Sequence, residues 1–133
     1  MNKENPFELP ITVRGYEMDA FGHVNNAVYA QYFEHCRWMG LRKWSQDWNA
    51  EMGGMVVKKL TIEYEAPARV FDELSVRLWV EEVGRTSLTF GQDLRRRDDD
   101  TLVATGEVVA VCIDASGTPR SVPESWRQAV ESC

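Results

Sequence analysis

The feature that most restricts how this chain folds is one long proline-free segment, Asn26–Trp44. Residues on one stripe of this segment recur every three or four positions: Ala30, Phe33, Arg37, Leu41 and Trp44. That period is typical of an α-helix with one face packed against a core. Asn25 or Asn26 supplies a side chain able to cap its first turn. No second segment carries the pattern at this length, so the fold is organised around a single long helix.

The middle of the chain changes to a period of two, which is typical of half-buried β-strands. Leu74, Val76, Leu78 and Val80 alternate with outward-facing neighbours in one such strand. Further strands are predicted at Ile11–Glu17, Val56–Glu65, Thr86–Arg96 and Leu102–Asp114. Turn-forming residues at 84–85 and 98–100 separate the last three strands, as in antiparallel hairpins. A short terminal helix is predicted over Pro123–Val130, with the proline near its start.

One long helix and about five strands within 133 residues indicate a single α+β domain, residues 1–133. A single helix cannot cover a five-stranded sheet. Apolar groups on the far side of the sheet, such as Trp79, or an edge strand would therefore stay exposed in a monomer. We expect a homo-oligomer that buries them, either a homodimer or a tetramer made of two dimers.

Charge and composition exclude several classes of partner. The chain has 15 lysines and arginines against 21 acidic residues, a formal charge of −6, so attraction to nucleic-acid phosphates cannot dominate its binding. No apolar run is long enough to span a membrane, and Met1–Pro10 has no apolar stretch like a secretory signal. We expect a cytoplasmic protein. The spacing of Cys36, Cys112 and Cys133 fits neither a disulfide framework nor a metal site.

Residues capable of chemistry concentrate where the first predicted strand meets the helix, in Tyr16–Tyr29 (YEMDAFGHVNNAVY). Asp19 precedes the helix N-terminus, where backbone amides without partners can stabilise a developing negative oxygen. A carboxylate and such amides are two parts that acyl transfer needs. Gly22 permits a close turn, and His23 can act as a base or an orienting donor.

These residues also have a purely structural interpretation. On spacing alone, Asp19 is more often a turn residue than a catalytic acid, and His23 is as readily a capping or turn residue. Glu34 on the helix is a second carboxylate candidate, although Arg37, three residues on, is an available ion-pair partner. The run RRRDDD, 95–100, is interpreted as a solvated hairpin end, because three acids neutralise its arginines. The chain contains no serine-hydrolase, P-loop or dinucleotide-binding motif.

The segment VRGYEMDAFGHVNNAVYAQYFEHCRW resembles the hotdog-fold acyl-CoA thioesterases of the 4-hydroxybenzoyl-CoA thioesterase type, and among them the bacterial long-chain acyl-CoA thioesterases. The D-x-x-G-H-V-N-N-x-x-Y block carries this resemblance, which extends from Ile11 through Ile62–Ala68 to the VCID sequence around Cys112. In that family a bent antiparallel sheet wraps the long helix, and two subunits form a dimer with sites at their interface. The resemblance implies the same hotdog fold here.

The resemblance also implies roles for individual residues. Asp19 would be the catalytic carboxylate, attacking the thioester carbonyl or activating water, and backbone N–H groups around Asn25 and Asn26 would form the oxyanion hole. His23 would support the turn or the thioester. The residues expected to bind substrate are Gly22, Val24, Tyr29, Lys59 and Arg85. Of these, the tyrosine would line the acyl pocket and the two cations would contact the phosphates of coenzyme A.

The sequence therefore predicts an acyl-CoA thioesterase that releases a free acid and coenzyme A from a medium- or long-chain substrate. Water, one carboxylate and oriented amides suffice, so no metal or redox cofactor is expected. Some hotdog thioesterases place a glutamate on the central helix, which makes Glu34 the reserve for Asp19. Two other functions stay open: a non-catalytic acyl-CoA-binding module, and a hydratase or dehydratase in which Asp19 and His23 move protons at carbon.

Overall fold

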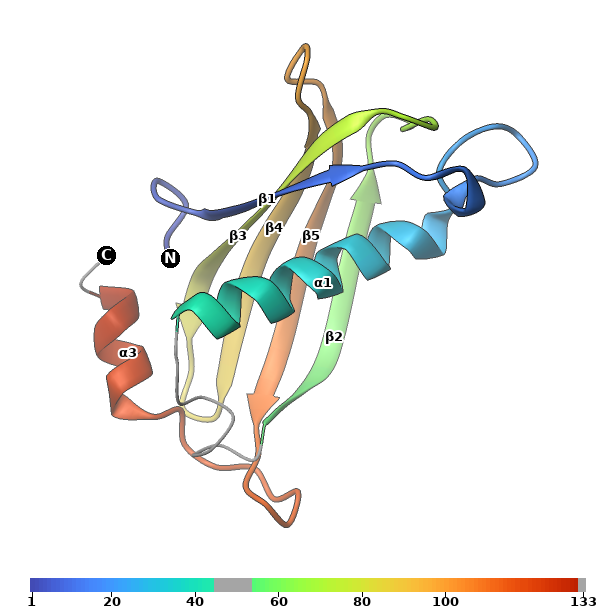
Figure 1. The fold of residues 1–133 in the computed structure, drawn as a ribbon. Coiled ribbons are helices and arrows are strands. Elements are labelled where there is room, and N and C mark those ends of the chain that lie inside the picture. The colour runs from blue at the N-terminus through green and yellow to red at the C-terminus, as the bar shows by residue number, and fades with distance from the viewer. Residues whose placement is uncertain (45–53, 132–133) are drawn as a thin grey trace.

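One sheet of five strands curves around one long helix in the computed structural model, which describes residues 1–44 and 54–131 (Figure 1). Cys133 lies outside the described residues. The elements are β1 (Phe7–Thr12), the 3-10 helix η1 (Gly15–Glu17), α1 (Asn26–Trp44), β2 (Met55–Tyr64), β3 (Glu73–Val83), β4 (Ser87–Arg96), β5 (Leu102–Cys112) and α3 (Glu124–Glu131). The predicted α+β class and the bent antiparallel sheet are confirmed.

The boundaries of α1 are those predicted, and β2 to β5 lie within two residues of their predicted positions. The first strand was predicted wrongly at Ile11–Glu17, because Pro10 was taken to end a preceding loop. β1 contains Pro10 and lies at one edge of the sheet, where a proline is tolerated because ladder hydrogen bonds are needed on one side only. The residues after it form η1, whose start is fixed by the Arg14 amide donating to Glu17 Oε1 at 2.8 Å.

The strand order is β1-β3-β4-β5-β2, and every neighbouring pair is antiparallel. Leu74, Val76 and Leu78 of β3 point inward, and α1 packs over β3 and β1. The β3–β4 and β2–β5 pairings each shift register once, and such bulges increase the bend of a sheet. The helix therefore packs mainly over β3 and β1 and leaves much of the inner face of β2 exposed.

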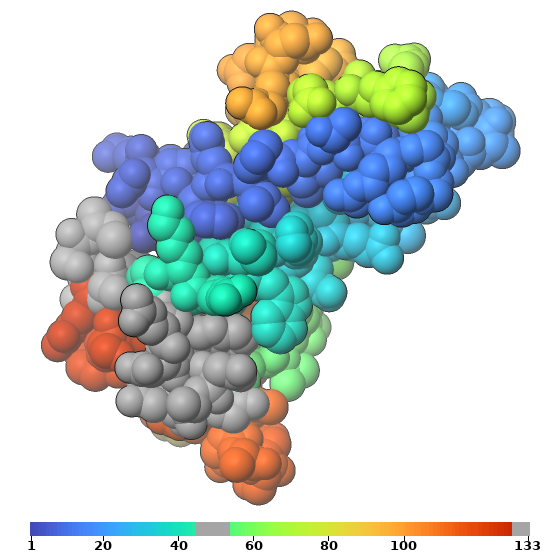
Figure 2. Space-filling model, in the orientation of Figure 1, coloured from blue at the N-terminus to red at the C-terminus, as the bar shows by residue number. Residues whose placement is uncertain are grey.

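The edge strand β2 keeps its apolar side chains exposed, as the single-helix argument predicts. In Figure 2 the green side chains of β2 lie at the border of the molecule beside α1. Val57, Leu60 and Tyr64 on the inner face are 47%, 41% and 50% exposed, and Val56 on the outer face is 51% exposed. A ten-residue edge with apolar groups on both faces is an open pairing surface.

The expected exposure of Trp79 is wrong, because the N-terminal residues and β4 cover it. The residue is only 5% exposed, and its ring lies over Gly91, where an added Cβ would come within 2.3 Å of the indole nitrogen. The Lys3 ammonium is 5.7 Å from the ring centroid, and the indole N–H donates to Glu81 at 2.7 Å. The outer face of the sheet is therefore not an apolar surface around this residue.

Arg37 is buried between α1 and the sheet. Its Nη1 donates to Gln92 Oε1 at 2.9 Å, and Gln92 Nε2 donates to the Phe33 carbonyl at 3.0 Å. The sequence made Arg37 an available ion-pair partner for Glu34, but the Arg37 side chain donates its hydrogen bond to Gln92 of β4. No helix within residues 1–44 and 54–131 is long and apolar enough to cross a bilayer.

Candidate active site

The loop between η1 and α1 is held at both of its ends. The Val24 amide donates to the Ala68 carbonyl at 2.8 Å, and the Asn25 amide donates to the Glu17 carbonyl at 2.9 Å. The buried Glu17 carboxylate also accepts the Tyr32 hydroxyl at 2.8 Å, which connects the loop to the body of the helix. A loop fixed in this way can present a side chain in one orientation.

Asp19 is both a turn residue and a pocket residue. Its Oδ1 accepts the backbone amides of Phe21 at 2.9 Å and His23 at 3.1 Å, and Gly22 between them has φ = 79°. The left-handed conformation of Gly22 is one that residues with a Cβ rarely adopt. Within the described part of the chain, Asp19 Oδ2 has no hydrogen-bond partner. The turn orients the carboxylate and leaves one oxygen available for chemistry.

In the part of the chain that the structure describes, the Asn26 backbone amide at the first turn of α1 has no acceptor. Asn25 is the N-cap residue: its Oδ1 accepts the Ala27 amide at 2.9 Å, and its carbonyl accepts the Val28 amide at 2.8 Å. Among residues 1–44 and 54–131, no acceptor is present for the Asn26 N–H. Helix N-termini carry partial positive charge, so this amide can receive an oxyanion.

Asp19 and Asn26 line one open pocket of about 260 Å³. Five of the predicted site residues line it: Asp19, His23, Val24, Asn26 and Tyr29. The sequence did not single out four others that do so: Tyr64, Glu65, Ala66 and Pro67. The only signal for them was that they fall in the Ile62–Ala68 segment of the family resemblance, because nothing local links the end of β2 to a loop 45 positions earlier.

Tyr29 and Tyr64 form an aromatic wall of this pocket. Tyr29 is buried, its hydroxyl accepts the Ala68 amide at 3.2 Å, and burial raises its pKa. Its ring centroid lies 5.3 Å from that of Tyr64, with an interplanar angle of 66°. The Tyr64 hydroxyl donates to the Asn26 carbonyl at 3.2 Å. The pocket therefore combines an acid, a free amide and an apolar wall.

Four predicted residues do not line the pocket. Gly22 and Asn25 shape the loop and the helix start. Lys59 is exposed on the outer side of β2, and Arg85 lies in the β3–β4 turn at the end of the sheet opposite to Asp19 (Figure 1). Within one chain, therefore, neither Lys59 nor Arg85, the two residues predicted to contact the coenzyme A phosphates, lies beside Asp19.

Glu34, the reserve carboxylate, is exposed on α1 and does not line the pocket. It raises the pKa of the Arg37 guanidinium by its charge, although burial lowers that pKa more. The geometry favours Asp19 over Glu34 as the acid at this site.

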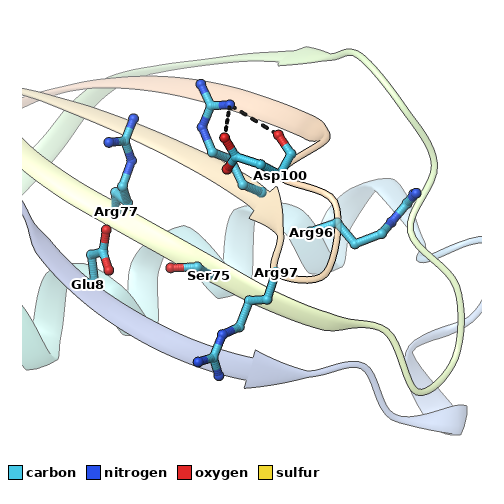
Figure 3. Close-up of a pocket in the computed structure, with 7 residues that line it drawn as sticks. Glu8, Ser75, Arg77, Arg96, Arg97 and Asp100 are labelled. Carbon is cyan, nitrogen blue, oxygen red and sulfur yellow. Dashed lines mark hydrogen bonds and ion pairs between the residues drawn. The ribbon is translucent and has the colours of Figure 1, made fainter.

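A larger hollow of about 460 Å³ lies on the outer face of the sheet, by the β4–β5 turn. Arg77 pairs with Asp93 through two hydrogen bonds, and Arg95 lies 3.5 Å from Asp93 and 3.8 Å from Asp100. Figure 3 shows Arg97 pointing away from Arg77. Because acids compensate Arg77 and Arg95, these residues form a network of ion pairs, which agrees with the solvated hairpin end predicted for 95–100.

Comparisons with known proteins identify the family of this chain. Residues 13–130 match the thioesterase-like superfamily. The acyl-CoA thioester hydrolase YbgC of Escherichia coli is 36% identical over 123 residues, 90% of this chain and 91% of the relative. The long-chain acyl-CoA thioesterase FadM of Escherichia coli is 34% identical, over 80% of this chain and 83% of the relative.

The fold is shared with solved structures of the same kind. A thioesterase from Thermus thermophilus, crystallised in complex with coenzyme A and Zn, is 30% identical with a TM-score of 0.84. The match covers 94% of this chain and 91% of that one. The resemblance seen in the D-x-x-G-H-V-N-N-x-x-Y block and the hotdog fold that it implied are both confirmed, and the chain belongs to the thioesterase-like superfamily.

Proposed function

We propose that this protein is an acyl-CoA thioesterase that hydrolyses its substrate at the pocket of Asp19. The observation that carries the proposal is that Asp19 and Asn26 line the same pocket, and that among residues 1–44 and 54–131 neither the Asp19 Oδ2 nor the Asn26 amide has a hydrogen-bond partner. A carbonyl carbon between them would meet a base or nucleophile on one side and an anion-stabilising donor on the other. The names of the relatives YbgC and FadM support the same reaction and the same substrate class.

The reaction needs only groups that this pocket provides. Asp19 either attacks the thioester carbon directly or removes a proton from the attacking water, and the carbonyl oxygen becomes an oxyanion at the Asn26 N–H. When water attacks, the C–S bond then breaks and the coenzyme A thiolate takes up the proton that Asp19 removed. When Asp19 attacks, breaking of the C–S bond leaves an anhydride between Asp19 and the acyl group. Water then hydrolyses this anhydride to the free acid, which regenerates the carboxylate and supplies the proton for the thiolate. Removing one such oxyanion donor costs on the order of 3 kcal/mol of transition-state stabilisation. His23, which also lines the pocket, supports the loop or the thioester.

The proposed substrate carries a medium- or long-chain aliphatic acyl group. The aromatic wall of Tyr29 and Tyr64 offers an apolar surface for an aliphatic chain beside the acid. The relative FadM is named for long-chain substrates, which supports this preference.

The active form in this proposal is a homodimer, or a tetramer of two dimers, with β2 at the dimer interface. Pairing β2 with the β2 of a second copy about a two-fold axis runs the two strands antiparallel. The Met55 end of one copy then lies beside the Tyr64 end of the other, so the partner's Arg85 comes to the end of the sheet that holds Asp19. This arrangement gives Arg85 and the exposed Lys59 their proposed role, which is to contact the phosphates of coenzyme A.

The proposed location of the protein is the cytoplasm. Cys36 and Cys112 are buried free thiols, and free thiols are typical of proteins in that reducing compartment.

A hydratase or dehydratase is the second candidate, because Asp19 and His23 line one pocket. Such an enzyme moves protons at carbon and releases no thiol. The two reactions are separated by product: free coenzyme A in one case and loss or gain of a conjugated double bond in the other.

The experiment that tests the proposed function follows thiol release from acyl-CoAs of graded chain length, from C4 to C16. We expect thiol release, with higher turnover of medium- and long-chain substrates than of the C4 substrate. A parent protein that releases no thiol but binds the same acyl-CoAs in calorimetry is a binding module. Conversion of an enoyl-CoA without thiol release would establish the hydratase instead.

A further inference from the structure

Tyr64 is the last pocket residue on the β2 side. It lines the pocket, whereas Ile62 and Leu60, which lie on the same inner face two and four positions earlier, do not. Those two side chains form an apolar strip that leads away from the pocket along the edge strand, and Leu60 is 41% exposed. The Tyr64 ring therefore stands between the pocket and the strip.

Two contacts hold this ring in place although half of the residue is exposed. The hydroxyl donates to the Asn26 carbonyl at 3.2 Å, at the start of α1. The ring lies edge-on against Tyr29, which is itself buried and fixed by the Ala68 amide. A side chain held at both its ring and its hydroxyl is a defined wall rather than a mobile cover.

We propose that Tyr64 is a specificity-determining residue that limits the size of the acyl group. The inference rests on the proposed thioesterase activity at the Asp19 pocket. A carbonyl at Asp19 and Asn26 places the acyl carbons against the Tyr29–Tyr64 wall, and a chain that outgrows the pocket meets the Tyr64 ring first. Removal of the ring joins the pocket of about 260 Å³ to the apolar strip of β2.

The role of the ring is separate from the role of the hydroxyl. The ring supplies the volume that obstructs a long chain, while the hydroxyl only fixes its position. Tyr64→Ala removes both, Tyr64→Phe removes the hydroxyl alone, and Tyr64→Trp enlarges the wall. Val56→Ala is the matched control, because Val56 lies on the same strand, is 51% exposed and faces the opposite side of the sheet.

The test is the ratio of kcat/KM for a C16 acyl-CoA to that for a C6 acyl-CoA. Tyr64→Ala is expected to raise this ratio about tenfold, since a few methylene groups admitted to an apolar site change selectivity by that order or more. Tyr64→Trp is expected to lower it. Tyr64→Phe and Val56→Ala are expected to stay within about twofold of the parent, and a residue with a merely structural role would lower all rates without changing the ratio.

An active parent whose ratio is the same in Tyr64→Ala overturns this inference and leaves the proposed function intact. A parent that hydrolyses no acyl-CoA overturns both. If Tyr64→Ala does not fold, as judged by circular dichroism, Tyr64→Trp decides: a ratio equal to that of the parent rejects the inference, and a lower ratio supports it.

Discussion

At the scale of the residue, the turn role and the proposed catalytic role of Asp19 are compatible. Oδ1 accepts two backbone amides and so fixes the carboxylate, while Oδ2 faces no partner in the described chain. From the sequence alone these roles were competing interpretations, because the residue type does not show which of the two carboxylate oxygens accepts the hydrogen bonds of the turn. The same applies to Asn25 and Asn26: one caps the helix, and the other offers the free amide.

Cys36 gives a pH-dependent prediction at this scale. Burial raises the pKa of its thiol from about 9 to about 12. Since the folded pKa is above the unfolded one, the thiol contributes stability that is complete below about pH 9 and is lost as the pH rises toward 12. Burial raises the pKa values of Tyr29 and Tyr32 as well, which acts in the same direction above about pH 10.

We expect the free energy of unfolding to decrease from pH 9 upward in urea titrations. Cys36→Ala should make that decrease shallower by at most about 1.4 kcal/mol per pH unit. The cavity left by the substitution lowers stability at every pH, so the slope and not the absolute value is diagnostic. Identical slopes in parent and variant would show that the buried thiol does not contribute.

At the scale of the element, Gln92 of β4 links α1 to the sheet. Its amide accepts from the buried Arg37 and donates to the Phe33 carbonyl. Gln92→Leu leaves a buried guanidinium and a buried carbonyl without these partners, so we expect a loss of about 2–4 kcal/mol in the free energy of unfolding. Chemical denaturation measures it, with Thr89→Val on the outer face of the same strand as the control. A loss below about 0.5 kcal/mol would show that the hydrogen bonds of Gln92 do not stabilise the packing of α1 on the sheet.

The sequence predicts an element accurately where one hydrophobic period continues over many residues. It is less accurate where the outcome depends on whether a strand lies at the edge of the sheet. The helical spacing in Asn26–Trp44 located α1 to the residue, because a long amphipathic stripe has one solution. Pro10 misplaced β1, because whether a proline is acceptable in a strand depends on whether that strand is an edge. The burial of Trp79 escaped prediction for a similar reason: Lys3 and Gly91 reach it only in the folded chain.

At the scale of the whole molecule, the unpaired β2 edge predicts assembly. Leu60→Lys places a charge on the exposed inner face of that edge, where one chain alone tolerates it. We expect the variant to sediment at half the mass of the parent dimer, or as a smaller species than a parent tetramer. We also expect it to lose thiol release while its circular dichroism spectrum stays that of a folded protein, although its melting temperature falls because association no longer stabilises it. A parent that is a monomer at micromolar concentration would contradict the interface.

The site is harder to predict than the fold, because it joins segments distant in sequence. The block from Asp19 to Tyr29 is local and was found from residue types and the family resemblance. Tyr64 comes from the far end of β2, and its contact with the helix start depends on the curvature of the sheet. Arg85 depends on a second copy in the proposed dimer, so its role is a prediction about the assembly.

The measurement that tests the account most directly compares kcat for thiol release in Asp19→Asn and Glu34→Gln. Removal of the loop carboxylate is expected to lower kcat by at least about 10³-fold, because it removes the base or nucleophile. Removal of the exposed helix carboxylate is expected to leave kcat within about threefold of the parent. Full activity in Asp19→Asn together with an inactive Glu34→Gln would contradict the assignment of the active site.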